Sequence, residues 1–372
     1  MEELTIFDLL PDDEAAKFKP LQATDWKWTF ADYPKEKNGL KVFSCFACGG
    51  GSTMGYKLAG CEVLGCCEID PKMNEVYVKN HNPKHNFLMD IREFNKLPDE
   101  EIPEDLLHLD ILDGSPPCTT FSMAGDREES WGKKKKFREG LAEQTLDDLS
   151  FVLIETVAKL KPYCVIMENV EGLIRVEAWT YVQRIYKEFK DIGYKVKHWL
   201  LKGQTMGVPQ KRHRVFFIAF REDADVDLES LDMSFNYEPI LYREFKSKEE
   251  QEAKGKISDA VKQLRPGESI GDAMFRIYGN HSALTHRVAR IDDVFPTQTA
   301  GHHDMWTESG NHPSISDMII AQTFPMDYDF LGGYTKVNYV CGMSVPPVMI
   351  KRIVQRLIES GCFDGCKRQA KG

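Results

Sequence analysis

The sequence lacks the features that mark membrane, secreted and repetitive proteins. It contains no run of about eighteen apolar residues, the length that a membrane-spanning helix requires. Its start, Met1-Glu-Glu-Leu, is acidic, whereas a secretory signal peptide begins with basic residues. Internal repeats and low-complexity segments are also absent. We therefore expect a cytoplasmic protein that has no membrane partner.

The ten cysteines lack the spacing of a zinc site. Cys45 and Cys48 form a Cys-x-x-Cys pair, but Cys362 and Cys366 have the wrong separation for a second pair. Most of the others lie in apolar stretches, where a thiol packs as a small hydrophobic group. A disulfide framework is not expected in a reducing cytosol. We predict that the protein holds no metal.

The chain lacks an excess of positive charge, because 58 acidic residues outnumber 48 Lys and Arg residues and give the 372-residue chain a net charge of −10. This balance argues against a protein that coats nucleic acid without specificity. The cations are unevenly distributed, however, and residues 132–138 read Gly-Lys-Lys-Lys-Lys-Phe-Arg. A local basic block can bind phosphates even when the whole protein is an anion.

From Leu40 onward, short apolar runs alternate with amphipathic stretches, a pattern typical of a doubly wound α/β sheet. We predict strands at 40–46, 61–67, 109–113, 163–168, 194–201 and 214–220. Helices are predicted at 53–59, from Pro71, at 146–160, at 179–189 and at 346–360. After Arg221 this alternation stops until about residue 315, which predicts a second, smaller domain or a large insertion.

A glycine-rich turn, Ala47-Cys-Gly-Gly-Gly-Ser52, joins the first predicted strand to the first helix. Such a turn lets backbone amides approach a cofactor, and Glu68 at the end of the second strand could bind ribose hydroxyls. The spaced Gly-x-Gly-x-x-Gly of dinucleotide sites is missing, which favours S-adenosylmethionine over nicotinamide or flavin cofactors. A purely structural turn remains an alternative.

Cys118 follows a strand and two prolines, in Pro116-Pro-Cys-Thr-Thr-Phe-Ser122. Open α/β sheets place their sites at the carboxyl edge of the strands, where this stiff turn would lie. A thiol exposed there can act as a nucleophile if its pKa is lowered. The alternative is a cysteine buried in a turn.

Two further clusters favour the nucleophile. Glu168 ends another strand of the same sheet, and Arg212 and Arg214 precede or begin a third. Considered apart from Cys118, Glu168 could equally cap a helix or a turn, and the two arginines could belong to a solvated basic turn. A cysteine, a carboxylate and paired arginines at one sheet edge indicate addition chemistry on a pyrimidine.

These motifs, in this order, resemble those of the C5-cytosine-specific DNA methyltransferase family across residues 38–360. The resemblance assigns a flipped cytosine in double-stranded DNA as substrate and S-adenosylmethionine as cofactor. Cys118 would add to carbon 6 of the ring, Glu168 would protonate N3, and Arg212 and Arg214 would position the base. The cofactor-binding residues that it implies are Phe46, Gly49, Gly51, Glu68, Asp70, Asp90, Ile91, Pro117 and Ser344.

The resemblance also implies how DNA is held. The basic block would lie in a loop that closes over DNA, and Thr297 and Thr299 would contact phosphates near the end of the smaller domain. The DNA-contacting cations that it implies are Lys133, Lys134, Lys135, Lys136 and Arg138. One departure from the family is Met343, where an asparagine is usual.

The predicted organisation is an N-terminal arm (1–37), a catalytic and cofactor-binding domain (38–221), a target-recognition domain (222–311) and a C-terminal return to the catalytic domain (312–372). We expect a monomer in a prokaryotic cell or a phage-infected host, with a separately encoded restriction endonuclease as a possible partner. Two alternatives are a transfer-RNA cytosine methyltransferase, whose Cys-Phe-Thr element is not evident before His312, and a catalytically silent DNA-binding protein.

Overall fold

The computed structural model contains two compact units, between which the backbone passes five times. The sheet unit comprises the described residues of 32–201, 213–234 and 350–372, and the mixed unit those of 1–31, 202–212 and 235–349. The structure describes residues 18–117, 135–136, 143–144, 149–175, 178–280, 282–301 and 304–369.

A seven-stranded sheet forms the centre of the sheet unit, in the order β3-β2-β1-β4-β7-β9-β8. Its strands are β1 (Lys41–Cys45), β2 (Glu62–Glu68), β3 (His85–Leu88), β4 (Ile111–Gly114), β7 (Cys164–Val170), β8 (Tyr194–Lys202) and β9 (His213–Arg221). The strands from β3 to β7 pair in parallel, and β9 pairs antiparallel with β7. The predicted doubly wound α/β sheet is therefore confirmed. The sequence pattern did not indicate the short edge strand β3, whose residues alternate between half-buried and exposed.

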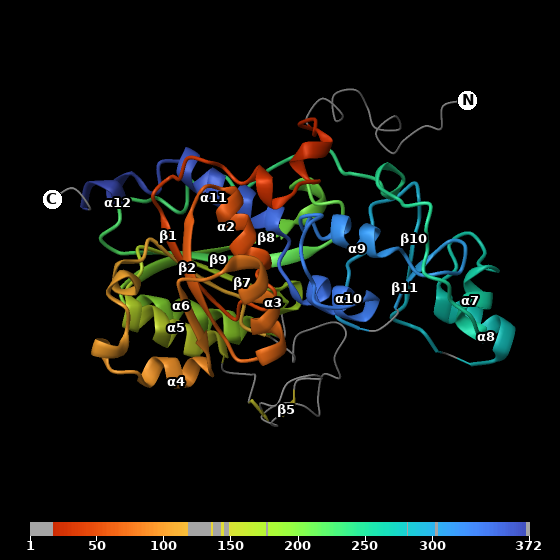
Figure 1. The fold of residues 1–372 in the computed structure, drawn as a ribbon, viewed down its shortest axis with the longest axis horizontal. Helices are drawn as coiled ribbons and strands as arrows, with labels where there is room; N and C mark the ends of the chain where they lie inside the picture. Colours follow the sequence, from red (N-terminus) through yellow and green to blue (C-terminus); the bar gives the residue numbers. More distant parts are fainter. Residues whose placement is uncertain are drawn as a thin grey trace. The chain divides into compact units, whose positions relative to one another are not determined.

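Helices cover both faces of this sheet. They are α2 (Gly51–Leu58), α3 (Pro71–His81), α4 (Ile91–Lys96), α5 (Leu149–Leu160) and α6 (Trp179–Asp191). The β1–α2–β2 and β2–α3–β3 connections step along the sheet in one direction, and β4–α5–β7 steps in the other. Right-handed crossovers therefore place α2 and α3 on the face opposite α5. Figure 1 shows α4, α5 and α6 beside one another.

Helix α5 shows how the sequence pattern becomes a buried face. The apolar residues that the pattern placed on one side of this helix pack into the core against the sheet: Leu149, Leu153, Val157 and Leu160. Each such side chain stabilises the fold by about 1.5–3 kcal/mol relative to an exposed position. The helix ends two residues before Pro162, which cannot continue it. The predicted first apolar residue, Leu146, lies outside the described residues.

The mixed unit consists of short elements joined by irregular segments. These are α7 (Lys256–Val261), α8 (Ile270–Tyr278), β10 (Arg287–Ala289), β11 (Met305–Thr307), α9 (Ile315–Ala321) and α10 (Tyr334–Met343). The two short strands pair in parallel. One small core surrounds Trp26, Tyr242 and Phe295, so residues near the N-terminus contribute to it. Trp28 is also buried, and its indole N–H donates to the carbonyl of Thr323 at 2.8 Å.

Helix α11 (Pro347–Glu359) carries the chain from the mixed unit back to the sheet unit, where α12 (Asp364–Gln369) follows. Within the part of the chain that the structure describes, every helix is too short or too polar to span a bilayer. The four-part domain organisation expected from the sequence stays a prediction. It divides the chain at residues 37, 221 and 311 by expected function, whereas the two units described above are defined by packing.

Candidate functional site

The loop between β1 and α2 has an unusual backbone. Phe46 and Cys48 have φ angles of 56° and 46°, and Gly50 has a φ of 81°. A positive φ is uncommon for residues other than glycine and costs of order 1–3 kcal/mol. Backbone hydrogen bonds hold the loop in this state, from Phe46 N to Cys67 O at 2.9 Å and from Gly50 N to Ala47 O at 2.8 Å. Strain of this kind is often found where a ligand binds.

Glu68, the last residue of β2, supports this loop. Its Oε2 accepts the backbone N–H of Cys48 at 2.7 Å, and its Oε1 accepts those of Ile69 and Asp70, both at 2.9 Å. The side chain is buried, and burial raises its pKa. Oε1 already accepts two hydrogen bonds, one for each of its lone pairs, whereas Oε2 accepts one and can accept one more. Glu68 therefore fixes the loop and keeps one acceptor position for a ligand hydroxyl.

The other predicted cofactor residues lie near helix starts. Asp70 Oδ1 caps α3 through Lys72 N at 2.8 Å, and Asp90 Oδ1 caps α4 through Arg92 N at 2.9 Å, directly before the buried Ile91. Asp70 Oδ2 is buried and has no hydrogen-bond partner among the described residues. An unsatisfied buried carboxylate oxygen is costly, which makes it a candidate contact for a polar ligand.

Inside the loop, Gly50 makes space for a histidine. An ideal Cβ at Gly50 would lie 2.2 Å from Nε2 of the buried His81 of α3, and this nitrogen is 3.3 Å from Gly49 O. Burial lowers the pKa of His81 to about 3, so the ring is neutral and its Nε2–H can donate to that carbonyl. Gly49 and Gly51 thus lie in a turn that α3 holds in place.

The end of β4 leads toward the predicted nucleophile. Asp113 is buried there and accepts hydrogen bonds from Ser44 Oγ at 2.6 Å and Tyr56 OH at 3.1 Å. The chain then runs through Pro117, and Asn169 Nδ2 of β7 donates to Pro116 O at 3.4 Å. Cys118 itself lies outside the described residues.

Glu168 and Arg214 form an ion pair at the same edge of the sheet. Arg214 Nε is 2.8 Å from Glu168 Oε1, and the two side chains are 15% and 12% exposed. The antiparallel register brings them together, because Val170 of β7 pairs with Arg214 of β9. Burial lowers the pKa of Arg214, and the neighbouring carboxylate opposes this shift. The structure therefore joins these two predicted residues directly.

Arg212 has different partners from Arg214. It is fully buried in the mixed unit, where its Nη1 donates to Gln298 O at 2.9 Å and its Nη2 to Gly342 O at 3.1 Å. Gln210 binds the same stretch, since its Oε1 accepts Gln298 N at 2.9 Å. In the described structure Arg212 therefore connects the segment around Gln298 to the end of α10. Its predicted role at the base stays a prediction.

Gly342 in α10 allows the segment around Thr299 to approach closely. An ideal Cβ on Gly342 would lie 2.3 Å from the carbonyl carbon of Thr299 and 2.4 Å from the nitrogen of Ala300. These are backbone atoms, so they cannot move away as a flexible side chain can. Asn338, one turn earlier, donates to Gly301 O at 2.7 Å and strengthens the same contact.

We predict that Gly342→Ala destabilises the protein by about 1–3 kcal/mol, the cost of overpacking a close contact. Urea unfolding of the variant and the unaltered protein measures this difference. Gly333→Ala is the matched control at the start of the same helix, because nothing lies within 4 Å of its ideal Cβ. Equal midpoints for the two variants would contradict the role assigned to Gly342.

The remaining predicted residues are the proposed DNA contacts and Ser344. Thr297, Thr299 and Ser344 belong to the mixed unit. Thr297 Oγ1 donates to Lys211 O, and Thr299 Oγ1 donates to Asp304. The hydroxyl of Ser344 is buried without a hydrogen-bond partner among the described residues, and Met343 beside it is 40% exposed. Lys133, Lys134 and Arg138 lie outside the described residues, and for Lys135–Lys136 only the backbone pairing with Glu143–Gln144 is described.

Sequence reasoning did not single out several buried polar residues. Asp113, Gln298 and Asn338 are each at most 5% exposed. The available signal was a polar residue within an apolar run, as in Ile111-Leu-Asp113 or Val337-Asn-Tyr-Val340. Among the described residues, no group of His, Cys, Asp and Glu side chains is arranged to hold a metal ion.

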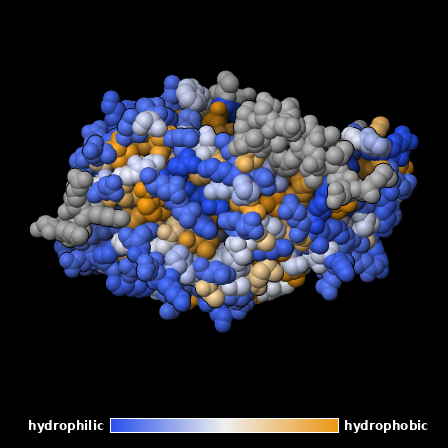
Figure 2. Space-filling view, turned by 90° about the horizontal axis from the view of Figure 1, so that it is seen from above, coloured by the Kyte–Doolittle hydropathy of each residue, from blue (hydrophilic) through white to orange (hydrophobic). Residues whose placement is uncertain are grey.

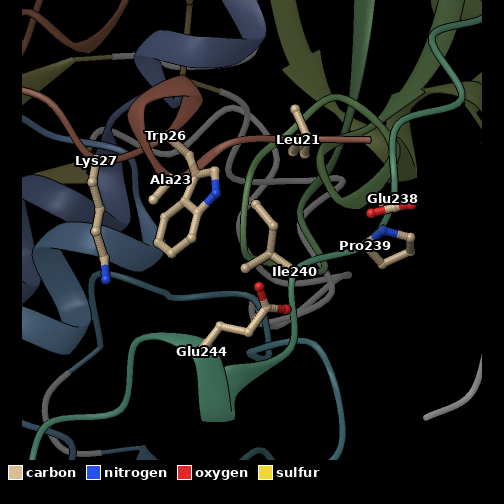
Figure 3. A pocket seen from close by; sticks show the side chains of 8 residues that line it. All are labelled: Leu21, Ala23, Trp26, Lys27, Glu238, Pro239, Ile240 and Glu244. Carbon is tan, nitrogen blue, oxygen red and sulfur yellow. The ribbon is translucent and has the colours of Figure 1, made fainter. Parts of the chain in front are cut away.

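A cavity of about 190 Å³ lies elsewhere in the mixed unit. Trp26, Ile240, Glu238 and Glu244 line it, and none of the predicted site residues does (Figure 3). On the face seen in Figure 2, hydrophobic residues are interspersed with hydrophilic ones. We assign no role in the reaction to this cavity.

Comparisons with known proteins agree with these motifs. The pattern of the C-5 cytosine-specific DNA methylase family matches residues 40–289. The chain is 31% identical to the Type II methyltransferase M.FnuDI of Fusobacterium nucleatum over 254 residues, which cover 68% of this chain and 65% of that protein, just under two thirds of its length. It is 28% identical to the Type II methyltransferase M.Sau96I of Staphylococcus aureus, and this match covers 87% of this chain and 77% of that protein.

A solved structure shares the fold. The crystal structure of a Spodoptera frugiperda DNMT2 mutant superposes with a TM-score of 0.59 over 86% of this chain and 100% of that one, at 14% identity. At this identity the likeness concerns the fold alone, whereas the family pattern covers most of the present sequence. The chain therefore belongs to the C-5 cytosine-specific DNA methylase family.

Proposed function

We propose that this protein transfers a methyl group from S-adenosylmethionine to carbon 5 of cytosine in double-stranded DNA. The Cys118 thiolate adds to carbon 6, and the new S–C bond makes carbon 5 electron-rich enough to take the methyl group. Transfer of the methyl group leaves the cofactor sulfur as a neutral thioether; a base then takes the proton from carbon 5, and the bond between Cys118 and carbon 6 breaks, which restores the aromatic ring and the Cys118 thiolate. Because carbon 5 and carbon 6 are stacked inside a duplex, the cytosine must be flipped out first.

The Glu168–Arg214 pair is the observation that carries this proposal. A carboxyl group that donates a proton to N3 lowers the barrier to thiolate addition, because the ring otherwise accumulates negative charge. Arg214 holds Oε1 of Glu168 at 2.8 Å, which leaves Oε2 for the base. Asn169, next to Glu168, donates to Pro116 O and so ties this edge to the segment that leads to Cys118.

The loop residues suit S-adenosylmethionine. Glu68 Oε2 retains an acceptor position for a ribose hydroxyl, and Asp70 Oδ2 is a buried acceptor without a partner among the described residues. Phe46 is half-buried and packs beside the core of the sheet unit, where an aromatic ring can contact an adenosine group. When bound, the cofactor supplies an electrophilic methyl group on a positively charged sulfur. We propose that Asp90, Ile91 and Pro117 complete this site, while the cofactor contact expected of Ser344 in the mixed unit stays a prediction.

We propose that the basic block contacts DNA phosphates. Log affinity falls linearly with log salt concentration, and replacing Lys133–Lys136 and Arg138 with alanine should make this negative slope less steep by about 0.9 for each phosphate that the protein no longer neutralises. Fluorescence anisotropy with a labelled duplex at several salt concentrations measures this slope. Lys187 and Lys190 on α6 are matched controls from a different part of the sheet unit, and their replacement should leave the slope unchanged. An unchanged slope for the block variant would contradict the proposal.

We further propose that residues 222–311 choose the DNA sequence, with Thr297 and Thr299 near its phosphates. The named relatives are Type II methyltransferases, which supports a role in restriction and modification beside a separately encoded endonuclease. The place of action would be where the DNA lies, in the cytoplasm of a prokaryotic cell or a phage-infected host, and the active form would be a monomer.

Bisulfite sequencing of DNA from cells that express the protein tests the function. Methylation at one recurring sequence context, absent from cells without the gene, is the expected result. Unmethylated DNA together with newly methylated cytosine in transfer RNA would replace DNA by RNA as the substrate. No new methylcytosine in either nucleic acid would contradict the enzymatic proposal and favour a protein that only binds DNA.

A further inference from the structure

Asp113 is a buried acid that has no cation beside it in the described part of the chain. Its side chain is 1% exposed at the end of β4, and no ion pair joins it to any lysine, arginine or histidine among the described residues. The hydrogen-bond donors that the described residues offer it are neutral hydroxyls: Ser44 at 2.6 Å, Tyr56 at 3.1 Å, and Ser52. A buried carboxylate of this kind is usually paired with a positive charge, because neutral donors only partly offset the cost of removing it from water.

Burial raises the pKa of Asp113 to about 6, although the three hydroxyl donors oppose the shift. Above that pH the protein therefore holds a negative charge in a low-dielectric position. An acid whose pKa is higher in the folded protein than the unfolded value of roughly 3.9 makes the fold less stable as pH rises from about 4 to about 6. The ionised group thus destabilises the protein when nothing positive is bound.

The donors show where this charge lies. Ser44 is the partner of Asp113 in the β1–β4 register and precedes the strained loop by two residues. Ser52 and Tyr56 belong to the first two turns of α2, directly after that loop. Asp113 is therefore bonded to both ends of the loop assigned to the cofactor, and it stands five residues before Cys118.

We propose that the Asp113 carboxylate is the countercharge for the sulfonium of S-adenosylmethionine, so that the protein binds the cationic methyl donor more tightly than the neutral thioether product. This inference rests on the cofactor proposed above and deepens it. Donor and product share the adenosine, the α-ammonium and the carboxylate groups, and they differ by the methyl group and the charge on sulfur. A fixed negative charge in a low-dielectric site attracts the positively charged sulfur of the donor but not the neutral sulfur of the product.

The other described ionisable groups that interact with Asp113 do not change this balance at neutral pH. Burial raises the pKa values of Cys45, Tyr56 and Tyr77 well above their ordinary values, so these groups remain uncharged. Glu168 repels the Asp113 charge, but its own charge is paired with Arg214. The preference for the donor should therefore decrease as pH falls through about 6, where Asp113 becomes protonated.

Isothermal titration calorimetry of the DNA-free protein tests the proposal. S-adenosylmethionine and S-adenosylhomocysteine are titrated separately, at pH 8 and at pH 5.5, into the unaltered protein and into Asp113→Asn. The asparagine keeps the size of the side chain, and the rotating hydroxyls can still bond to it. We expect the variant to bind the donor about tenfold more weakly at pH 8 and the product with nearly unchanged affinity.

One further variant and one further measurement distinguish an effect of the Asp113 charge from an effect on the structure. Ser44→Ala removes a hydrogen bond but keeps the carboxylate, so it should retain the preference at pH 8 and lose it at a higher pH than the unaltered protein does. Thermal unfolding without ligand should show Asp113→Asn to be at least as stable as the unaltered protein at pH 8, because the uncompensated charge is gone.

Each outcome separates this inference from the proposed function. If Asp113→Asn weakens donor and product equally, or weakens neither, the countercharge role is wrong while the cofactor assignment stands. If the unaltered protein binds neither compound, the proposed cofactor itself is wrong.

Discussion

Replacing Cys118 with serine should abolish cytosine methylation, with a rate at least about 10⁴-fold below that of the unaltered protein. A serine hydroxyl is smaller than a thiol and is far less nucleophilic and far less acidic, so addition to carbon 6 would not occur at a useful rate. Transfer of a tritiated methyl group to duplex DNA measures the rate. DNA affinity should be nearly unchanged, because the substitution removes neither a charge nor a phosphate contact.

Cys366→Ser is the matched control. The side chain of Cys366 is partly buried, and its thiol donates to Asp110 Oδ1 at 2.6 Å, a bond that a serine hydroxyl can replace. Its activity should therefore equal that of the unaltered protein. Residual methylation by the Cys118→Ser protein at more than a few per cent of the normal rate would refute the covalent route, as would failure to detect a Cys118 adduct by mass spectrometry when the second half of the reaction is blocked.

Glu168→Gln should lower the single-turnover methylation rate by about 10²–10⁴-fold, the usual contribution of a positioned general acid. The glutamine keeps the shape of the side chain and can still accept a hydrogen bond from Arg214, but it cannot donate a proton to N3. Affinity for S-adenosylmethionine should change little, since the two oxygens of Glu168 face the paired arginine and the proposed base site. A rate that falls less than tenfold would exclude Glu168 as the acid.

Arg214→Met is the complementary change, because it leaves the carboxylate of Glu168 without its partner. Since Glu168 is only 12% exposed, this loss should destabilise the protein by about 1–3 kcal/mol, whereas Glu168→Gln should cost less. Urea unfolding of both single variants and of the double variant gives the coupling energy of the pair. A double variant less stable than Arg214→Met would contradict a direct interaction.

Much of the sheet could be predicted because its signals are local. Buried strands appear as short apolar runs, and the face of α5 follows the helical spacing of Leu149, Leu153 and Val157. The motif residues also end or begin predicted strands, which was enough to place Glu168 and Arg214 at one edge. The family itself could be identified from the order of these motifs, and the family comparison confirms it.

The connections made by buried polar side chains could not be predicted in this way. Arg212 and Gln210 bind carbonyl and amide groups of Gln298, 86 and 88 residues away. Nothing in the local pattern around Gln210-Lys-Arg-His-Arg214 distinguishes an arginine that contacts a base from one that binds two buried carbonyls. Likewise, the sequence shows a glycine at 342 but not that Thr299 backbone lies within 2.4 Å of its Cβ position.

The chain's amino acids alone determined the succession of strands and helices, the glycine turn and the placement of chemically suited residues at strand ends, because hydrophobic periodicity and residue type act over a few neighbouring positions. The tertiary structure decided which polar groups meet: Glu168 with Arg214, Glu68 with the backbone of the cofactor loop, and Asp113 with hydroxyls on both sides of that loop. Burial and strand register set those partners, and both depend on segments that are distant along the chain.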